Sequence, residues 1–406
     1  MGARGQRPIR VFDTLTQRLG PLPVSSGEGG GPLLKLYVCG ITPYDSGHLG
    51  HAFTFASFDI LIRWALASGV GVRYVQNVTD VDDPLFERAR RDGVRWNELA
   101  EREVRSFRSD LASLGCRLPD VMPRVSEEIP AILAAVERLA AGGYGYAADA
   151  YYFDVSRYPG YGQLSHRSRR SMVRKLREEG LLGVVGPGAK RSPLDFPLWR
   201  ASAEDEPAWP SAFGPGRPGW HIECSAMSMR HLGEQVDVHG GGRDLAFSHH
   251  ESERAQSECL TGVVPFARAW MHTGMVRYEG RKMSKSLGNL VNVSQTLERV
   301  PAAAVRLYLA SHRYRRDWSF RWEGLDRAAR LTERVRNLQE VARGGGAGPT
   351  ATAMPRGAAA REFAAALNDD LDTPRGIRAL RAAVRDRDAA AATWMLGILA
   401  GDAALS

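Results

Sequence analysis

The sequence predicts an α/β fold in which a parallel sheet is followed by a helical region. Two observations lead to this prediction. Short apolar runs at 34–40, 71–78 and 235–242 end in glycine or acidic residues, and stretches with helical spacing of apolar residues follow at 48–67 and 249–260. Strands that alternate with helices are typical of parallel sheets, whose ligands bind beyond the carboxyl ends of the strands. The length of 406 residues suits two or three domains.

Four segments are expected along the chain. Residues 1–115 would form the first half of the sheet domain and residues 196–300 its second half, and the helical, loop-rich stretch 116–195 would be an inserted connective subdomain. Residues 301–406 have helical patterning, interrupted by GGGAGPTATAMP at 344–355, a composition typical of a flexible connection. We therefore expect a C-terminal helical bundle.

Composition excludes several classes of protein. Hydrophobic residues make up 44% and charged residues 25%, and these ordinary values exclude disordered and fibrous proteins. No apolar run approaches the length of a membrane span, and MGARGQRPIR lacks the apolar region of a signal peptide, so we expect a cytoplasmic protein with no membrane partner. We also expect a monomer. Four cysteines are too few for a disulfide scaffold. The net charge of +8 would suit RNA or a nucleotide, but it is too modest to decide.

The segment TPYDSGHLGHA places His48 and His51 one turn apart at the start of a predicted helix, with Gly50 between them. Imidazoles beside free backbone N–H groups at the positive end of a helix make an anion site, and Gly50 would let a phosphate or base approach closely. A capped helix with two surface histidines is the alternative.

A second candidate is the glycine-flanked loop GRKMSKSLGN at 280–289. It carries two lysines and two serines, namely Lys282, Ser284, Lys285 and Ser286. Such a loop could close on a triphosphate and stabilise charge as pyrophosphate leaves, whereas a lone basic turn is usually a solvated loop.

Together, HLGH and KMSKS resemble the paired signatures of the class I aminoacyl-tRNA synthetases. The resemblance implies a Rossmann-like nucleotide-binding sheet and an enzyme that uses ATP, with Mg²⁺, to activate an amino acid as its adenylate. It implies catalytic roles for His48, His51, Lys282 and Lys285. It also implies contacts with ATP for Gly50, Ser284 and Ser286.

Cys39, Cys224, His249 and Glu253 offer two thiolates, an imidazole and a carboxylate. His249 and Glu253 are four residues apart and therefore share one helix face. The set would make a four-coordinate zinc site if the fold brings the segments together, which spacing alone does not show. The alternatives are a buried thiol at Cys39 and an ordinary helix pair.

The motifs YVCGIT, TDVDD, GRPGWHIECSAM, HGGGxDL and HHExE, in this order before KMSKS, resemble the cysteinyl-tRNA synthetases and the related cysteine ligase of mycothiol synthesis. The resemblance spans about residues 10–330. It implies one zinc ion per chain, held by the four residues above, that binds the thiolate of L-cysteine and selects sulfur over the hydroxyl of serine.

The same resemblance implies roles for the neighbours of these residues. The cysteine pocket would be lined by Thr42, Thr79 and Trp220, and the adenosine pocket by Gly240, Gly241, Gly242 and Asp244. Trp220 could instead be a core aromatic residue, and His250 either supports a ligand or lies on the surface. Cys116 and Cys259 match no ligand pattern and are expected to be structural.

The acceptor of the cysteinyl group is the open question. The chain ends about 120 residues after KMSKS, which leaves little room for an anticodon-binding region and favours a small amino-sugar acceptor. Pro43 and Pro84 resemble the ligase, whereas Glu253, HGGG and VFDTLTQ follow the synthetase pattern. We therefore expect an ATP-dependent, AMP-forming ligase that joins L-cysteine to the amine of glucosaminyl-inositol. A truncated enzyme that charges tRNA(Cys) and a non-catalytic synthetase-like binding paralogue remain the alternatives.

Overall fold

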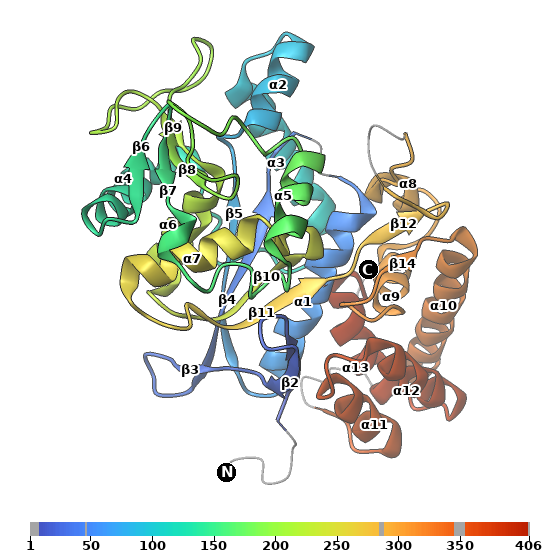
Figure 1. The fold of residues 1–406 in the computed structure, drawn as a ribbon. Helices are drawn as coiled ribbons and strands as arrows, with labels where there is room; N and C mark the ends of the chain where they lie inside the picture. Colours follow the sequence, from blue (N-terminus) through green and yellow to red (C-terminus); the bar gives the residue numbers. More distant parts are fainter. Residues whose placement is uncertain (1–7, 45–46, 284–287, 345–353, 405–406) are drawn as a thin grey trace.

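The computed structural model describes residues 8–44, 47–283, 288–344 and 354–404 (Figure 1). At its centre is a parallel sheet, as the sequence predicted, and its four parallel strands follow the order β11-β10-β4-β5. A short strand, β3 (Ser25–Ser26), runs antiparallel to the start of β4. The parallel strands are β4 (Pro32–Ile41), β5 (Gly71–Val78), β10 (Val236–Gly242) and β11 (Ala267–Thr273).

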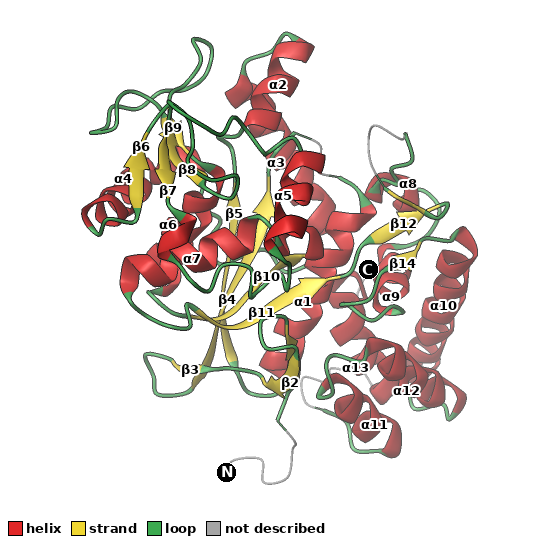
Figure 2. Ribbon diagram, in the orientation of Figure 1, coloured by secondary structure: helices red, strands yellow, loops and turns green. Residues whose placement is uncertain are grey.

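Helices cover both faces of this sheet (Figure 2). Helix α1 (Leu49–Ala67) packs on β5, β10 and β11, and α6 (Trp220–Leu232) packs on β4, β5 and β10. Helix α7 (His249–Thr261) follows β10 through the short helix η2 (Arg243–Ala246) and packs against α6. The fold is therefore the layered α/β arrangement that the alternating pattern indicated.

Alternation along β4 decides which side chains meet which helix. Leu34, Leu36 and Val38 belong to the apolar core that includes α1, whereas Tyr37 and Cys39 belong to the core that includes α6. Successive side chains of a strand point to opposite faces, so one strand supplies both cores. Cys39 thus lies on the side of the sheet that α6 covers.

The segment between β5 and α6 contains helices and a second sheet. The helices are α2 (Asp83–Asp92), α3 (Trp96–Ser113), α4 (Val125–Ala141), η1 (Val155–Arg157) and α5 (Arg169–Glu178). The antiparallel sheet has the order β6-β7-β8-β9, with strands β6 (Gly145–Ala147), β7 (Tyr151–Phe153), β8 (Phe196–Arg200) and β9 (Arg217–Pro218). These strands could not be predicted from the sequence, because each spans five residues or fewer and is too short to show periodicity. Two of them, β8 and β9, lie beyond residue 195, the expected end of the inserted subdomain. The division of the chain into four segments stays a prediction.

The remaining elements lie at the two ends of the chain. An N-terminal hairpin, β1 (Arg10–Asp13) and β2 (Arg18–Pro21), packs beside β11. A small sheet of order β13-β12-β14 contains β12 (Val276–Tyr278), β13 (Arg281–Lys282) and β14 (Trp318–Ser319). The C-terminal helices are α8 (Val293–Leu297), α9 (Ala302–Ala310), α10 (Trp322–Gly344), α11 (Ala358–Leu367), α12 (Thr373–Arg385), α13 (Ala389–Ala400) and η4 (Gly401–Ala404). Among the described residues, no helix is both long and apolar enough to cross a bilayer.

Candidate active site

A cavity of about 380 Å³ lies where the four parallel strands end. The residues that follow β4, β5, β10 and β11 line it together with the start of α1. Eleven of the residues singled out in the sequence line this cavity: Cys39, Thr42, His48, Gly50, His51, Thr79, Trp220, Cys224, Gly242, Asp244 and His249. The fold therefore brings the candidate nucleotide motif and the candidate metal ligands, which are far apart in the sequence, into one site, here called the adenylate cavity.

Other candidate residues lie near this cavity without lining it. A Cβ atom on Gly240 would overlap the ring of Phe58 in α1, and one on Gly241 would lie 2.9 Å from Leu245 Cδ1. Both glycines thus allow close packing of β10, and only Gly242 of the three reaches the cavity.

The KMSKS loop begins at β13. The side chain of Lys282 is not described, and Ser284, Lys285 and Ser286 lie outside the described residues. Met283, within the loop, and Leu290, directly after it, both line the adenylate cavity. The described ends of the loop therefore border the site.

His48 caps the N-terminus of α1. Its Nδ1 atom accepts hydrogen bonds from the backbone N–H groups of Gly50 (3.1 Å) and His51 (3.4 Å), and its ring stacks on that of His51 with 4.0 Å between centroids. A Cβ atom on Gly50 would lie 2.9 Å from the His48 ring. Because Nδ1 acts as the acceptor, the neutral imidazole carries its proton on Nε2. The N–H groups of Leu49 and Ala52 are bonded as well, to the carbonyls of Val291 and His48, so the free backbone N–H groups expected at this helix start are absent from the first turn. What remains for an anionic ligand is the positive end of the helix dipole and the imidazole donor.

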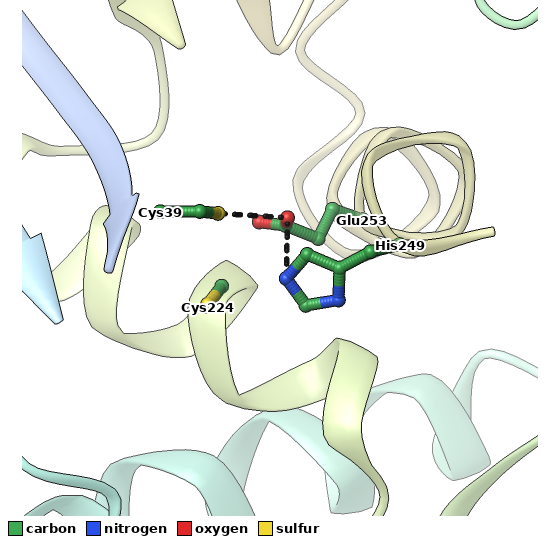
Figure 3. A group of neighbouring side chains, drawn as sticks. All are labelled: Cys39, Cys224, His249 and Glu253. Atoms are coloured by element: carbon green, nitrogen blue, oxygen red, sulfur yellow. Dashed lines mark hydrogen bonds and ion pairs between the residues drawn. The ribbon is translucent and has the colours of Figure 1, made fainter. Parts of the chain in front are cut away.

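The four candidate metal ligands meet beside the adenylate cavity (Figure 3). One ligand atom from each of Cys39, Cys224, His249 and Glu253 lies within 4.8 Å of all the others. Glu253 Oε1 is 3.0 Å from His249 Nε2 and 3.5 Å from Cys39 Sγ. All four side chains are buried. This juxtaposition is the one that spacing alone could not show.

The donor chemistry of this cluster fits a zinc ion. Two thiols, an imidazole and a carboxylate form a ligand set typical of tetrahedral zinc. Burial raises the pKa of both Cys39 and Cys224, and Glu253 Oε2 is buried without a hydrogen-bond partner among the described residues. A bound dication would supply the positive charge that stabilises these thiolates and this carboxylate.

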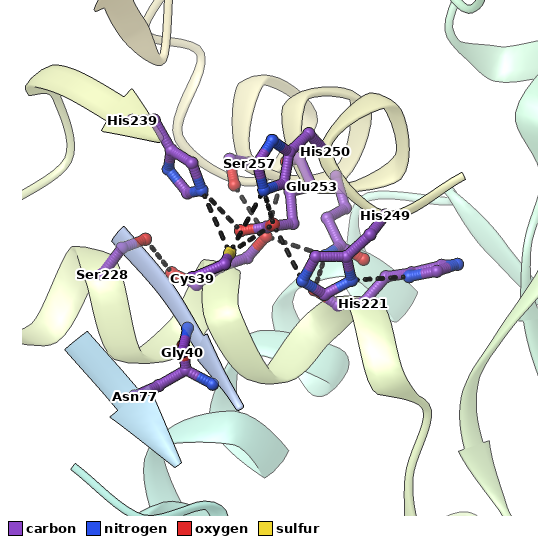
Figure 4. A network of polar contacts seen from close by, with 12 residues as sticks. Cys39, Gly40, Asn77, His221, Ser228, His239, His249, His250, Glu253 and Ser257 are labelled. Atoms are coloured by element: carbon purple, nitrogen blue, oxygen red, sulfur yellow. Dashed lines mark hydrogen bonds and ion pairs between the residues drawn. The ribbon is translucent and has the colours of Figure 1, made fainter. Parts of the chain in front are cut away.

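Further histidines surround the cluster: His239, which was not among the candidates from the sequence, and His250, whose role was left open (Figure 4). His239 of β10 lies 3.5 Å from Cys39 Sγ and 3.4 Å from Glu253 Oε2 through its Nε2 atom. His250 is fully buried, its Nε2 atom lies 3.3 Å from Cys39 Sγ, and its Nδ1 atom lies 2.8 Å from His272 Nε2. His250 is therefore not a surface residue.

These histidines give the cluster a second possible ligand set. Cys39, His239, His250 and Glu253 also lie close enough to hold an ion, and they share two members with the first set, so the two sets are alternatives for one ion. Burial lowers the pKa of His249 to about 3, which leaves a neutral imidazole able to coordinate a metal. A sequence signal did exist for His239, because it lies in the apolar run 235–242, which was predicted to be a strand.

The predicted cysteine pocket is held together by hydrogen bonds at the strand ends. Asn77 at the end of β5 donates to Thr79 Oγ1 (2.9 Å) and accepts from the backbone N–H of Gly40 (2.8 Å). Thr42 donates to Asp82 (3.1 Å), whose pKa is raised to about 6 by burial and by neighbouring Asp83. Asn77 lines the cavity and was missed because a lone asparagine carries no motif.

Trp220 and the two remaining cysteines also have defined surroundings. The ring of Trp220 stacks on that of His249 with 4.3 Å between centroids, so this tryptophan lines the cavity and orients a candidate ligand. Cys116 accepts a hydrogen bond from Arg306 (2.8 Å), and burial raises the pKa of Cys116 and of Cys259 to about 11. Neither cysteine belongs to a metal-ligand set among the described residues.

Comparison with known proteins identifies relatives of two kinds. The chain is 44% identical over 382 residues, 93% of its length and 78% of the relative's, to a protein of Frankia casuarinae named L-cysteine:1D-myo-inositol 2-amino-2-deoxy-alpha-D-glucopyranoside ligase. A protein of the same name from Frankia alni is 48% identical over 358 residues, 86% of this chain and 83% of the relative. A cysteine–tRNA ligase of Dehalococcoides mccartyi is 43% identical over 331 residues, 81% of this chain and 70% of the relative.

Solved structures share the fold at much lower identity. A methionyl-tRNA synthetase of Mycobacterium tuberculosis in complex with methionyl-adenylate has a TM-score of 0.65 at 15% identity, with 92% of each chain covered. The family model described as "tRNA synthetases class I (C) catalytic domain" matches residues 29–330, which include every candidate site residue named above. The chain therefore belongs to the family of class I (C) tRNA synthetase catalytic domains.

Proposed function

We propose that this chain uses ATP to activate L-cysteine as cysteinyl-adenylate and transfers the cysteinyl group to the amine of glucosaminyl-inositol, releasing AMP and pyrophosphate. The proposal rests on the cluster of two thiols, an imidazole and a carboxylate. This cluster lies beside a cavity that is also lined by the N-terminus of α1. The names of the ligase relatives support the choice of acceptor.

Recognition of L-cysteine would combine the metal cluster with the pocket around it. A zinc ion held by Cys39, Cys224, His249 and Glu253 would supply a soft Lewis acid that prefers thiolate sulfur to a hydroxyl oxygen. Trp220 fixes the ring plane of His249 through stacking. Thr79, held by Asn77, presents its hydroxyl in the cavity beside the ligand cluster, where it would contact the polar groups of the amino acid.

Adenylate formation would take place at the N-terminus of α1. The carboxylate oxygen of cysteine forms a bond to the α-phosphorus of ATP as the bond from that phosphorus to the bridging oxygen of pyrophosphate breaks. The proton on His48 Nε2 and the positive end of the α1 dipole would stabilise the negative charge on the α-phosphoryl oxygens. His51 would act beside His48, with Lys282 and Lys285 assisting the departure of pyrophosphate, and Mg²⁺ would accompany ATP.

Nucleotide contacts would come from the end of β10 and the residues that follow it. Gly242 and Asp244 line the cavity after β10, and Asp244 would accept hydrogen bonds from the ribose hydroxyls.

In the second half-reaction the neutral amine of the acceptor attacks the carbonyl carbon of the adenylate, AMP leaves from that carbon, and the amine loses a proton.

The cysteine–tRNA ligases favour a second candidate function, the charging of tRNA with cysteine, because they are 42–43% identical to this chain. Their matches cover 330 and 331 residues, whereas matches to three named cysteine:glucosaminyl-inositol ligases cover 358, 369 and 382. The longer matches favour the amino-sugar acceptor.

The test is to incubate the purified chain with L-cysteine and ATP, together with either glucosaminyl-inositol or tRNA, and to identify the products by mass spectrometry. We expect the cysteinyl amide of glucosaminyl-inositol with equimolar AMP, at a rate nearly insensitive to moderate salt, and none with serine. Efficient charging of tRNA without reaction of the amino sugar would contradict the proposed acceptor. No cysteine-dependent ATP–pyrophosphate exchange would indicate a non-catalytic protein. We also expect the protein to be cytoplasmic and monomeric. Sedimentation of the purified chain tests the monomeric state.

A further inference from the structure

A second cavity, here called the arginine cavity, lies in the C-terminal helical region. Its volume is about 500 Å³, and it is lined by residues of α9, β14, α10 and α12 and of the loops next to them. Among the described residues, none lines both this cavity and the adenylate cavity. Its volume is that of a site for a small molecule.

The arginine cavity carries positive charge without a counter-charge. Arg321, Arg327 and Arg381 line it and are exposed. Within the part of the chain that the structure describes, no Asp or Glu lines the cavity and none of these three arginines forms an ion pair. Arginines of the surrounding elements are paired, since Arg299 contacts Asp326 and Arg313 contacts Asp372. Three charges are therefore left to face one small cavity.

The rest of the lining is neutral. Hydroxyl groups come from Tyr308, Ser311 and Ser319, and burial lowers the pKa of His312 to about 4, so this imidazole is uncharged at neutral pH. The ring of His312 stacks on that of Trp318 with 3.7 Å between centroids, which gives the cavity an aromatic wall. Leu307, Leu331 and Ile377 add an apolar surface.

This lining has the chemistry of a site for a phosphate group. A guanidinium presents N–H donors in a planar fork that matches the oxygens of a phosphate, and such charge-assisted hydrogen bonds are stronger than neutral ones. The hydroxyl groups of Tyr308 and Ser319 would add further donors, whereas that of Ser311 already donates to the Tyr308 carbonyl (2.6 Å). The apolar surface suits the carbon skeleton of an ester. A concavity of about 500 Å³ suits a small molecule better than the extended backbone of a nucleic acid.

We propose that the arginine cavity binds a small phosphorylated ligand, either a phosphate monoester or inorganic phosphate, at a site separate from the adenylate cavity. The proposal does not depend on the reaction proposed above, because Arg321, Arg327 and Arg381 have no part in that reaction.

The test is calorimetric titration of the full chain at low ionic strength with inorganic phosphate and, separately, with glucose 6-phosphate. We expect saturable binding that falls at least about tenfold in each of Arg321→Gln, Arg327→Gln and Arg381→Gln, the effect of losing a charge-assisted hydrogen bond. The triple variant should lose binding. Tighter binding of glucose 6-phosphate would identify an ester as the ligand, and equal or tighter binding of phosphate would identify the free anion.

Arg336→Gln is the matched control, because Arg336 is an exposed arginine of α10 that lines neither cavity. It should bind both ligands as the unaltered chain does. Absence of saturable binding, or binding that the three substitutions leave unchanged, would overturn the proposal. The proposal would also be overturned if neither small ligand binds, a short RNA does bind, and the triple variant loses this RNA binding. The arginine cavity would then be part of a nucleic-acid surface.

Discussion

Asp59→Asn probes the buried ion pair that joins α1, the helix that begins at the active site, to the C-terminal helices. Asp59 is 2% exposed and accepts hydrogen bonds from Arg63 Nε (2.9 Å), Arg306 Nη2 (2.6 Å) and the backbone N–H of Arg117 (2.8 Å). Arg306, in α9, is completely buried. The substitution keeps the size of the side chain and removes its charge.

The expected magnitude follows from the burial of Arg306. Without the carboxylate, its guanidinium would stay buried and unpaired, and breaking a buried pair in this way costs about 3–5 kcal/mol. Asp326→Asn is the matched control, because Asp326 pairs with Arg299 and both side chains are about a third to a half exposed (32% and 47%). The control should lose less than about 1 kcal/mol. Adding Arg306→Met to Asp59→Asn should recover much of the loss, since the unpaired charge is then gone.

The assay is urea unfolding at pH 7, followed by circular dichroism. The pH dependence has a definite sign. Burial by itself raises the pKa of Asp59, but Arg306, Arg63 and the Arg117 N–H together hold it below its usual value. The stabilisation is therefore present above the unfolded-state pKa of about 3.9 and is lost as the pH falls through the lower folded-state value. A loss below about 1 kcal/mol at pH 7, or a difference from the unaltered chain that grows in acid, would refute this reasoning.

Three further predictions concern the active site and its scaffold. Purified protein should carry about one zinc ion per chain, measured by atomic emission. Cys224→Ala should lose the metal and the selectivity for cysteine over serine, whereas the control Cys259→Ala should keep both. Zinc retained by Cys224→Ala would contradict the ligand set. Lys285→Ala should lower cysteine-dependent ATP–pyrophosphate exchange about 10²-fold or more, and unchanged exchange would argue against its role. Gly240→Ala should destabilise the fold by about 1–3 kcal/mol in urea unfolding, because its Cβ atom would overlap the ring of Phe58, and an unchanged midpoint would show that this contact relaxes freely.

Much of the local structure could be predicted because it depends on near neighbours in the chain. The apolar runs at 34–40 and 71–78 lie within β4 and β5, and the helical spacing at 48–67 corresponds to α1. The four-residue separation of His249 and Glu253 places both on one face of α7, where His249 Nε2 lies 3.0 Å from Glu253 Oε1. These features follow from the periods of strand and helix, which the sequence displays directly.

The sequence by itself determined the parallel α/β class, the strand ends that carry polar groups and the motifs HLGH and KMSKS. Only the tertiary structure decided that Cys39 of β4, Cys224 of α6 and Glu253 of α7 share one cluster, and that His239 stands beside them. The same holds for the arginine cavity, whose lining comes from three helices and a strand. The physical reason is that periodicity fixes which face of an element a residue occupies, whereas strand order, register and helix packing fix which faces meet. Those depend on burial between segments that are distant in the chain.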